Sequence, residues 1–134
     1  MDAKVYVISK IKYAEMWREL RDKVNIISSW IDIENDTLIS NPDLLTKMWS
    51  TFIEEASTCT HAIIYGESEE QLKGGLVELG AALAGGATVY VIGYVPELRT
   101  VQFHPRIHLE SSISEVLKKI QTYHEERIES TENH

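Results

Sequence analysis

Short runs of β-branched and aromatic residues alternate along this chain with longer segments of helical periodicity, and that alternation limits the possible folds. The predicted strands are residues 5–9, 26–30, 62–65, 88–92 and 107–109. The predicted helices are residues 13–24, 44–56, a glycine-containing segment within 72–86, and 112–123. Strands that are separated by helices pair in parallel through right-handed crossovers. We therefore predict an α/β fold, an open and mostly parallel five-stranded Rossmann-like or flavodoxin-like sheet with helices on both faces.

Capping residues mark several of these boundaries. Asn41-Pro42 precedes the second helix, Gly85-Gly86 ends the third, and Ser112 with Glu115 forms a Ser-x-x-Glu capping box at the start of the last. Residues 125–134 are polar and charged, which is typical of a disordered tail. We predict one domain over residues 1–124, followed by that tail.

Composition and charge narrow the class of protein. The 134 residues are 43% hydrophobic and 25% charged, which suits one globular domain with a core. The formal net charge of −8 argues against binding to nucleic acid, because affinity for a phosphate backbone rests on clustered lysine and arginine. A small-molecule ligand is the remaining expectation.

The cysteine content and the first residues of the chain indicate the cellular compartment of the protein. Cys59 is the single cysteine and cannot form a disulfide within the chain. The start MDAKVYVISK does not resemble a secretory signal, and no apolar run approaches the length of a membrane span. We expect a cytoplasmic protein that does not insert into a membrane.

Glu78 is the first candidate for chemistry. If its segment is helical, Gly74 and Gly75 lie one turn earlier, and the missing side chains leave room beside the carboxylate. Close approach of a ligand is one reason for two adjacent glycines in a helix. The alternative is a surface helix whose glycines mark its start and whose Glu78 is solvated.

Further candidates lie where the predicted strands end, because ligands of such sheets bind at the carboxyl edge. These strand-end residues are Ser9, Lys10, Ser29, Trp30, Asp32 and Tyr65. Trp30 is a candidate for stacking on a base, although a tryptophan after a strand is more often part of the core. Lys73, together with the amides of Gly74 and Gly75 at a helix start, is a candidate anion site. Lys10, Lys12 and Arg18 form an alternative basic spot.

The chain resembles the nucleoside 2-deoxyribosyltransferases and their nucleotide N-glycosidase relatives. The resemblance rests on Tyr6 in the first strand, an apolar third strand, and the pattern G-x-x-x-E-x-G-x-A at Gly74, Glu78, Gly80 and Ala82. The segments SKIKYAEMWRELR and IISSWIDIE are similar to a phage-associated and bacterial branch of such proteins. The resemblance implies that Glu78 is a nucleophile for the anomeric carbon and that Tyr6 positions it.

Two departures from the family bear on the substrate. Six residues before the glutamate, the transferases carry an aspartate for the sugar 5′-hydroxyl and the nucleotide hydrolases a serine for a 5′-phosphate, whereas this chain has Leu72. The acidic residue that the resemblance places late in the second helix has no match in register, although Glu54 and Glu55 are nearby. The 5′ substituent and the proton donor therefore stay open.

The reaction itself accounts for a carboxylate and a second acid. Breaking an N-glycosidic bond develops positive charge on the sugar, which a carboxylate stabilises or traps as a covalent intermediate. A second acid must protonate the departing base, and Asp32, Glu67 and Glu69 are the candidates. We predict cleavage or transfer at the N-glycosidic bond of a nucleoside or nucleotide. The alternative is a non-catalytic sensor or interaction protein that retains the fold.

The remaining expectations concern metals, cofactors and assembly. His104 and His108 are spaced for a helix, but Pro105 between them disfavours one, so no metal site is predicted. No dinucleotide or Walker pattern occurs, and no cofactor is expected. Apolar residues that look exposed, among them Trp49, Phe52 and Phe103, predict a homodimer or higher homo-oligomer with contacts at residues 44–56 and 95–108.

Overall fold

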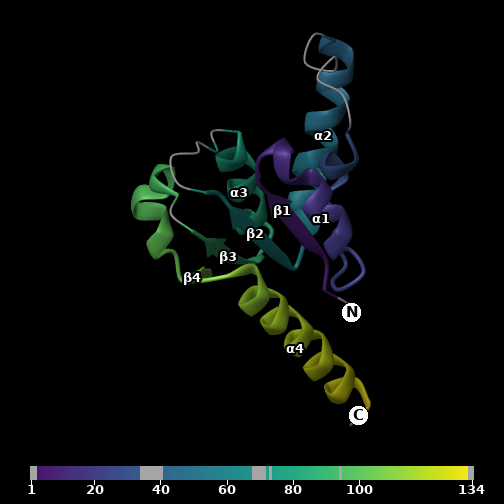
Figure 1. The fold of residues 1–134 in the computed structure, drawn as a ribbon, viewed down its shortest axis with the longest axis vertical. Helices are drawn as coiled ribbons and strands as arrows, with labels where there is room; N and C mark the ends of the chain where they lie inside the picture. The colour runs from purple at the N-terminus through teal and green to yellow at the C-terminus, as the bar shows by residue number, and fades with distance from the viewer. Residues whose placement is uncertain (1–2, 34–40, 68–71, 73, 94, 133–134) are drawn as a thin grey trace.

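Within the residues that the structure describes, the protein is built on one sheet of four parallel strands (Figure 1). The computed structural model describes residues 3–33, 41–67, 72, 74–93 and 95–132. The strands lie side by side in chain order: β1 (Val5–Ile8), β2 (His61–Tyr65), β3 (Thr88–Ile92) and β4 (Ile107–Glu110). All neighbouring pairs are parallel, which confirms the predicted α/β sheet and corrects the expected strand count from five to four.

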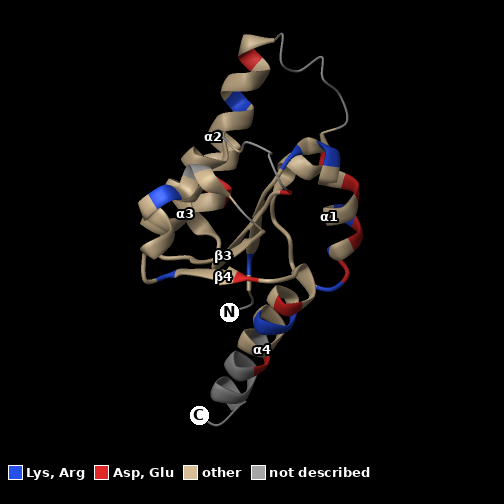
Figure 2. Cartoon of the chain, turned by 60° about the vertical axis from the view of Figure 1, so that its left-hand side comes forward, with Lys and Arg blue, Asp and Glu red and all other residues tan. Residues whose placement is uncertain are grey.

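Helices connect the strands and cover the sheet. They are α1 (Ala14–Leu20), α2 (Pro42–Thr58), α3 (Gly75–Ala84) and α4 (Ile113–Glu132), with shorter 3-10 helices η1 (Ile11–Tyr13), η2 (Ser29–Asp32) and η4 (Pro96–Phe103). Figures 1 and 2 show α2 and α4 extending beyond the sheet in opposite directions. None of the helices within the described residues is long and apolar enough to cross a membrane.

The two faces of the sheet carry different helices. His61 of β2 contacts Tyr123 of α4, and Tyr65 of β2 contacts Trp17 of α1. Tyr6 of β1 is level with Ala62, the residue after His61, and contacts Glu78 of α3. Because side chains alternate between the faces of a sheet, α1 and α4 cover one face, whereas α3 and the α2 helix packed on it cover the other. Helices on both faces were predicted, and this arrangement confirms them.

The segment predicted as the second strand, residues 26–30, forms only one bridge beside β1. The ladder begins normally, since Val5 N donates to Asn25 O and Ile27 N donates to Val5 O, both at 2.8 Å. Beyond that point, side-chain hydrogen bonds to β1 take the place of the backbone hydrogen bonds of a strand ladder. Val7 N donates to Ser28 Oγ and Trp30 Nε1 donates to Val7 O, both at 2.6 Å. The backbone hydrogen-bonding groups at this edge of β1 thus have partners without a fifth strand, and the chain continues into η2.

Local signals explain where α2 and α4 begin. Asn41 Oδ1 accepts from the backbone N–H groups of Asp43 and Leu44, and Pro42 occupies the first helical position. Ser112 Oγ accepts from Glu115 N at the start of α4, which is one half of the predicted capping box. This helix continues to Glu132 and is longer than the predicted 112–123, so residues 125–132 are helical. The domain boundary at residue 124 stays a prediction.

Candidate active site

Tyr6 and Glu78 form the centre of the candidate site. The Tyr6 hydroxyl donates a hydrogen bond to Glu78 Oε2, which confirms the contact predicted from the sequence. Tyr6 is fully buried in β1, whereas Glu78 lies in the first turn of α3 and is half-buried. Helix α3 follows the carboxyl end of β2 in the chain, so Glu78 lies just after the edge where ligands of parallel sheets bind, whereas Tyr6 reaches it from the second residue of β1.

The two glycines before Glu78 bring α3 against the sheet. A Cβ at Gly75 would lie 2.5 Å from Ile8 Cγ2, closer than two carbons can approach. At Gly74 a Cβ would lie 3.4 Å from the Trp49 ring. The space at Gly75 is therefore filled by Ile8, which contradicts a gap for a ligand at that position, whereas Gly74 is exposed. Their effect is indirect, since the close packing sets Glu78 beside Tyr6.

Partial burial changes the ionisation of both members of the pair. The pKa of Glu78 is raised to about 7, chiefly by removal from water; the Tyr6 hydrogen bond opposes this rise and the charge of Glu55 adds to it. Burial also raises the pKa of Tyr6, helped by the charge of Glu78 and their hydrogen bond. Tyr6 therefore stays protonated and remains a donor, while Glu78 titrates near neutral pH.

A second carboxylate, that of Glu55, lies near this pair. Ser29 donates to Glu55 Oε1 from its backbone nitrogen at 3.1 Å and from its hydroxyl at 2.9 Å. The charge of Glu55 contributes to the raised pKa of both Tyr6 and Glu78. Sequence reasoning considered Glu55 and assigned it no role. The available signal was helical spacing, because Glu55 lies three residues after buried Phe52 on α2.

The residues predicted at the end of the second strand have separate roles. Ser29 holds Glu55, as described above. Trp30 is 7% exposed and belongs to the core, where its indole N–H is bound to Val7 O, so it is not a stacking surface. Asp32 is held by Arg21 through two hydrogen bonds of 2.9 and 2.6 Å. The Arg21 hydrogen bond holds the pKa of Asp32 below its usual value, which makes Asp32 a poor proton donor.

Other predicted binding residues lie elsewhere. Tyr65 is on the α1 face of the sheet, in edge contact with the rings of Tyr13 and Trp17, and its hydroxyl donates to Glu67 at 3.0 Å. The hydroxyl oxygen of Ser9 is buried and has no hydrogen-bond partner within the described residues. Lys10 precedes η1 and is half-buried.

Some predictions fall on residues that the structure does not describe. Lys73 and Glu69 are outside the described ranges, and so the anion site predicted at Lys73 stays a prediction. Among the residues that are described, no group of three or more histidine, cysteine or acidic side chains is placed to hold a metal ion. His104 uses its Nδ1 to accept from Arg106 N at 3.0 Å.

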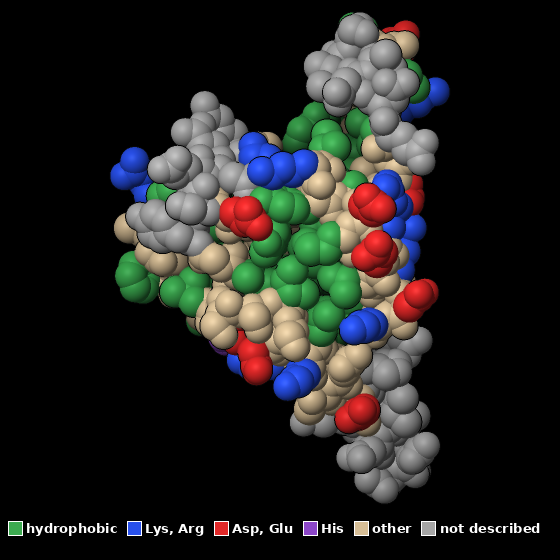
Figure 3. All heavy atoms as spheres, viewed as in Figure 1, with side chains coloured by type: hydrophobic (Ala, Val, Ile, Leu, Met, Phe, Trp, Pro, Cys, Tyr) green, Lys and Arg blue, Asp and Glu red, His purple; other side chains and the backbone are tan. Residues whose placement is uncertain are grey.

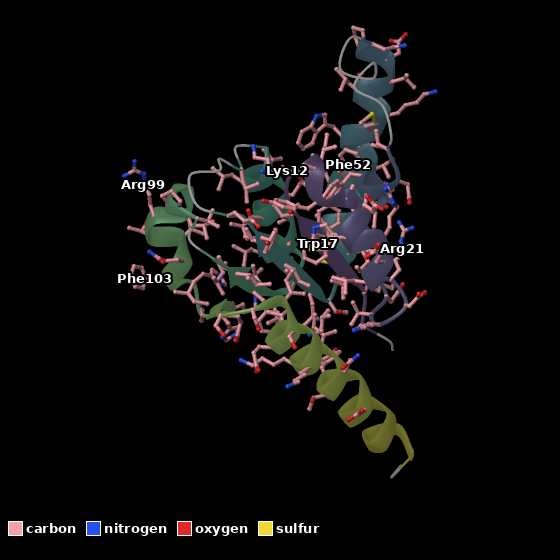
Figure 4. The ribbon with its side chains drawn as sticks, viewed as in Figure 1. Lys12, Trp17, Arg21, Phe52, Arg99 and Phe103 are labelled. Atoms are coloured by element: carbon pink, nitrogen blue, oxygen red, sulfur yellow. The ribbon has the colours of Figure 1, made fainter. Side chains whose placement is uncertain are left out.

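Two surface hollows are separate from the Tyr6–Glu78 pair. One, of about 660 Å³, lies between β3, η4 and β4 and is lined in part by Arg99, Phe103 and Leu109. Figure 4 shows Arg99 and Phe103 pointing outward from η4. The other, of about 610 Å³, lies between the end of α1 and α4, beside Arg21 and Gln121. On the face seen in Figure 3, hydrophobic side chains gather at the centre, with charged groups around them.

Comparison with known proteins identifies the fold. No protein-family model and no curated protein sequence matches this chain. A solved 2-deoxyribosyltransferase from the psychrotolerant bacterium Bacillus psychrosaccharolyticus is 17% identical, with a TM-score of 0.66 over 86% of this chain and 90% of that one. A CMP N-glycosidase from Clostridium botulinum is also 17% identical, with a TM-score of 0.53 over 90% of this chain and 99% of that one. The chain therefore has the fold of a 2-deoxyribosyltransferase and of a CMP N-glycosidase.

Proposed function

We propose that this protein is an enzyme that cleaves or transfers at the N-glycosidic bond of a nucleoside or nucleotide. The observation that carries the proposal is the hydrogen bond between Tyr6 and Glu78, in which a half-buried carboxylate is held by a tyrosine that keeps its proton. The two solved structures with the same fold support it, because one is a 2-deoxyribosyltransferase and the other a CMP N-glycosidase.

In the proposed reaction the ionised Glu78 attacks the anomeric carbon of the sugar. A bond forms between a Glu78 oxygen and that carbon while the bond from carbon to the base nitrogen breaks. The electron pair of the broken bond leaves with the base nitrogen, which takes up a proton from solvent. Water or a second base then attacks the same carbon, gives up a proton to solvent and releases Glu78 as a carboxylate, giving hydrolysis or transfer. Tyr6 fixes the direction of the carboxylate throughout and supplies no proton to the base.

The pKa of Glu78 suits this task. A carboxylate with a pKa of about 7 is more basic than an ordinary glutamate, which favours bond formation to an electron-poor carbon. The nucleophile must be ionised, and so the activity is expected to rise as the pH increases through about 7. A pH profile of kcat/KM that falls across this range would contradict the role of Glu78 as nucleophile.

The decisive experiment is product analysis with a panel of nucleosides, nucleotides and NAD. We expect the wild type to release or exchange a base from at least one of them. Glu78→Gln keeps the shape of the side chain and removes its charge, and we expect a loss of about 10³-fold or more with that substrate. Glu54→Gln is the matched control, because Glu54 is exposed on α2, and its rate should equal that of the wild type. An unchanged rate in Glu78→Gln would overturn the proposal.

The alternative is a non-catalytic sensor of a nucleotide-derived ligand, or an interaction protein with this fold. The observation in its favour is Leu72, which is 6% exposed and apolar at the position where the resemblance places a polar contact to the 5′ substituent. In that case the panel would yield no product, while one of its compounds would raise the melting temperature of the protein. Stabilisation that survives Glu78→Gln, without turnover in the wild type, would establish the alternative.

A further inference from the structure

The hollow between β3, η4 and β4 has no part in the proposed reaction. Its volume of about 660 Å³ is within the range of sites for small ligands, roughly 300–1,000 Å³. The described residues that line it come from β3, η4, β4 and the loop that begins at Gly93, after β3. Neither Tyr6 nor Glu78 is among them. The hollow is therefore a place for a ligand other than the sugar that the Tyr6–Glu78 pair would attack.

Apolar side chains form most of this hollow. Val91, Val95 and Leu98 are buried beside it. Phe103 and Leu109, which also line it, are 80% and 62% exposed, although both are large and apolar. Figure 4 shows Phe103 pointing outward from η4. Large apolar side chains exposed at a hollow favour a ligand with an apolar body, because the ligand would remove them from water.

Arg99 is the one charged residue among the described lining residues. Its side chain is exposed, and within the described part of the chain it has no hydrogen bond or ion pair. Arg106, by contrast, donates from Nε to Ala87 O at 3.2 Å and so holds the fold together. Thr100 and Gln102 add polar groups to the lining. The guanidinium of Arg99 is thus available to an anionic group of a ligand.

The backbone of Arg99 is strained. Its φ of 45° and ψ of −123° interrupt η4, and no other non-glycine residue of the described ranges has a positive φ. The other positive φ values are at Gly86 and Gly93. A residue with a Cβ loses stability in this region of backbone space, and such strain is concentrated at ligand sites and active sites. An arginine where a glycine would fit better therefore indicates a use for its side chain.

We propose that this hollow binds a small aromatic anion, with its ring against Phe103 and Leu109 and its anionic group on Arg99. The exposed apolar side chains account for the ring, and the single unpaired guanidinium accounts for one carboxylate, phosphate or sulfonate group. The volume fits a small molecule rather than a folded partner, whose contact would be larger and flatter. The inference does not rest on the proposed function.

A pair of fluorescent probes tests the site on the full chain. Anilinonaphthalene sulfonate is an aromatic anion, and phenylnaphthylamine has the same rings without the sulfonate. The wild type should bind the sulfonate more tightly than the neutral amine. Arg99→Gln should weaken the sulfonate by about tenfold or more and leave the amine unchanged, whereas Phe103→Ala should weaken both. Equal affinity of Arg99→Gln and the wild type for the sulfonate would overturn the inference.

The matched control is on a different apolar surface. Lys47→Gln removes an exposed positive charge from α2, where Leu44, Trp49 and Ile53 are also exposed. Its affinity for both probes should equal that of the wild type. A loss of sulfonate binding in Lys47→Gln that equals the loss in Arg99→Gln would show general attraction to positive charge and would overturn the site.

Replacement of Arg99 by glycine tests the strain. Arg99→Gly should bind the sulfonate as weakly as Arg99→Gln, yet its melting temperature should be higher than that of the wild type by about 2–5 °C, because the strained Cβ is gone. Arg99→Gln keeps the Cβ, and its melting temperature should match the wild type. A melting temperature of Arg99→Gly below that of Arg99→Gln would contradict the strain and overturn the inference that Arg99 is retained for a ligand.

A second copy of the chain is the competing occupant of the hollow. Light scattering of Phe103→Ala, at the concentration used for the probes, separates the two. An oligomer mass equal to that of the wild type supports a site for a small ligand. A lower mass in Phe103→Ala would identify the hollow as a contact between copies and would overturn the proposal.

Discussion

Glu78 and His61 are two ionisable side chains withdrawn from water on opposite faces of the same sheet. Glu78, on the α2–α3 face, is half-buried and receives a hydrogen bond from Tyr6. His61, on the α1–α4 face, is 3% exposed, stacked 6.2 Å from Tyr90 and in edge contact with Tyr123 at 4.6 Å. Burial raises the pKa of Glu78 and lowers the pKa of His61. In each case it disfavours the charged form.

The two regions differ in the polar groups that surround the titratable side chain. Among the described residues, His61 has a hydrogen bond with the Thr60 hydroxyl, 2.8 Å from its Nδ1, and contacts the rings of Tyr90 and Tyr123. Glu78 accepts a hydrogen bond from the Tyr6 hydroxyl, and the charge of Glu55, which Ser29 holds, also raises its pKa. A buried ionisable group is thus a poor sign of function by itself, and the hydrogen-bonded partners distinguish a site from a core.

Of the variants that compare the two faces, Tyr6→Phe is expected to have the largest effect, with Tyr90→Phe as its control. Tyr6→Phe removes the donor to Glu78, and a hydrogen bond to a charged group is worth about 1.5–3 kcal/mol, so kcat/KM should fall by about 10- to 100-fold. Tyr90→Phe removes a hydroxyl on the opposite face and should leave kcat/KM within about twofold of the wild type. Equal losses in the two variants would erase the distinction between the regions.

A structural effect is expected from two glycines of α3. Gly75→Ala places a methyl group 2.5 Å from Ile8 Cγ2 and should lower the free energy of unfolding by about 1–3 kcal/mol, while separating Glu78 from Tyr6. At Gly80 an added Cβ would meet no atom within 4 Å, and Gly80→Ala should raise the free energy of unfolding by up to about 1 kcal/mol. Urea unfolding measures both. A stabilised Gly75→Ala would show that α3 is free to move from β1.

Stability should depend on pH with opposite signs in the two regions. Glu78 has a raised pKa, so its contribution to stability is present below pH 4.5 and is lost as the pH rises through about 7. His61 has a lowered pKa, so its contribution is present above pH 6.5 and is lost as the pH falls through the lowered value. The free energy of unfolding can be measured from pH 5 to 8. In Glu78→Gln it should fall less than in the wild type as the pH rises. In His61→Phe it should fall less than in the wild type as the pH falls. Identical pH curves for both variants and the wild type would contradict these assignments.

The smallest effect is expected on the oligomeric state, through the apolar residues exposed on α2. Helix α2 extends beyond the sheet (Figure 2). It exposes Leu44, Trp49 and Ile53, although Phe52, which the sequence suggested as exposed, is buried. We propose a homodimer or higher homo-oligomer through this helix. Light scattering at micromolar concentration should give a multiple of 15.3 kDa, and Ile53→Glu should lower it. A wild-type mass of 15.3 kDa would contradict the proposal.

Much of the fold was predictable because the relevant signals are local. The alternation of strand and helix residues gave four strands that the structure confirms, and Asn41-Pro42 and Ser112 mark helix starts that their own side chains make. The contact of Tyr6 with Glu78 was also predicted, through the resemblance of the motif around Glu78 rather than through periodicity.

Contacts between distant segments decided the rest. Residues 26–30 have the composition of a strand, but Ser28 and Trp30 bond to Val7 with their side chains, so the ladder stops after one bridge. The two glycines before Glu78 suggested space for a ligand. Only the tertiary structure shows that Gly75 lets α3 pack against Ile8 of β1. Glu55 of α2 is held by Ser29 of η2, and its charge acts on Glu78, because these elements pack together near β1. Local sequence determines which elements form because their signals lie within a few residues, whereas their facing partners depend on packing across the whole chain.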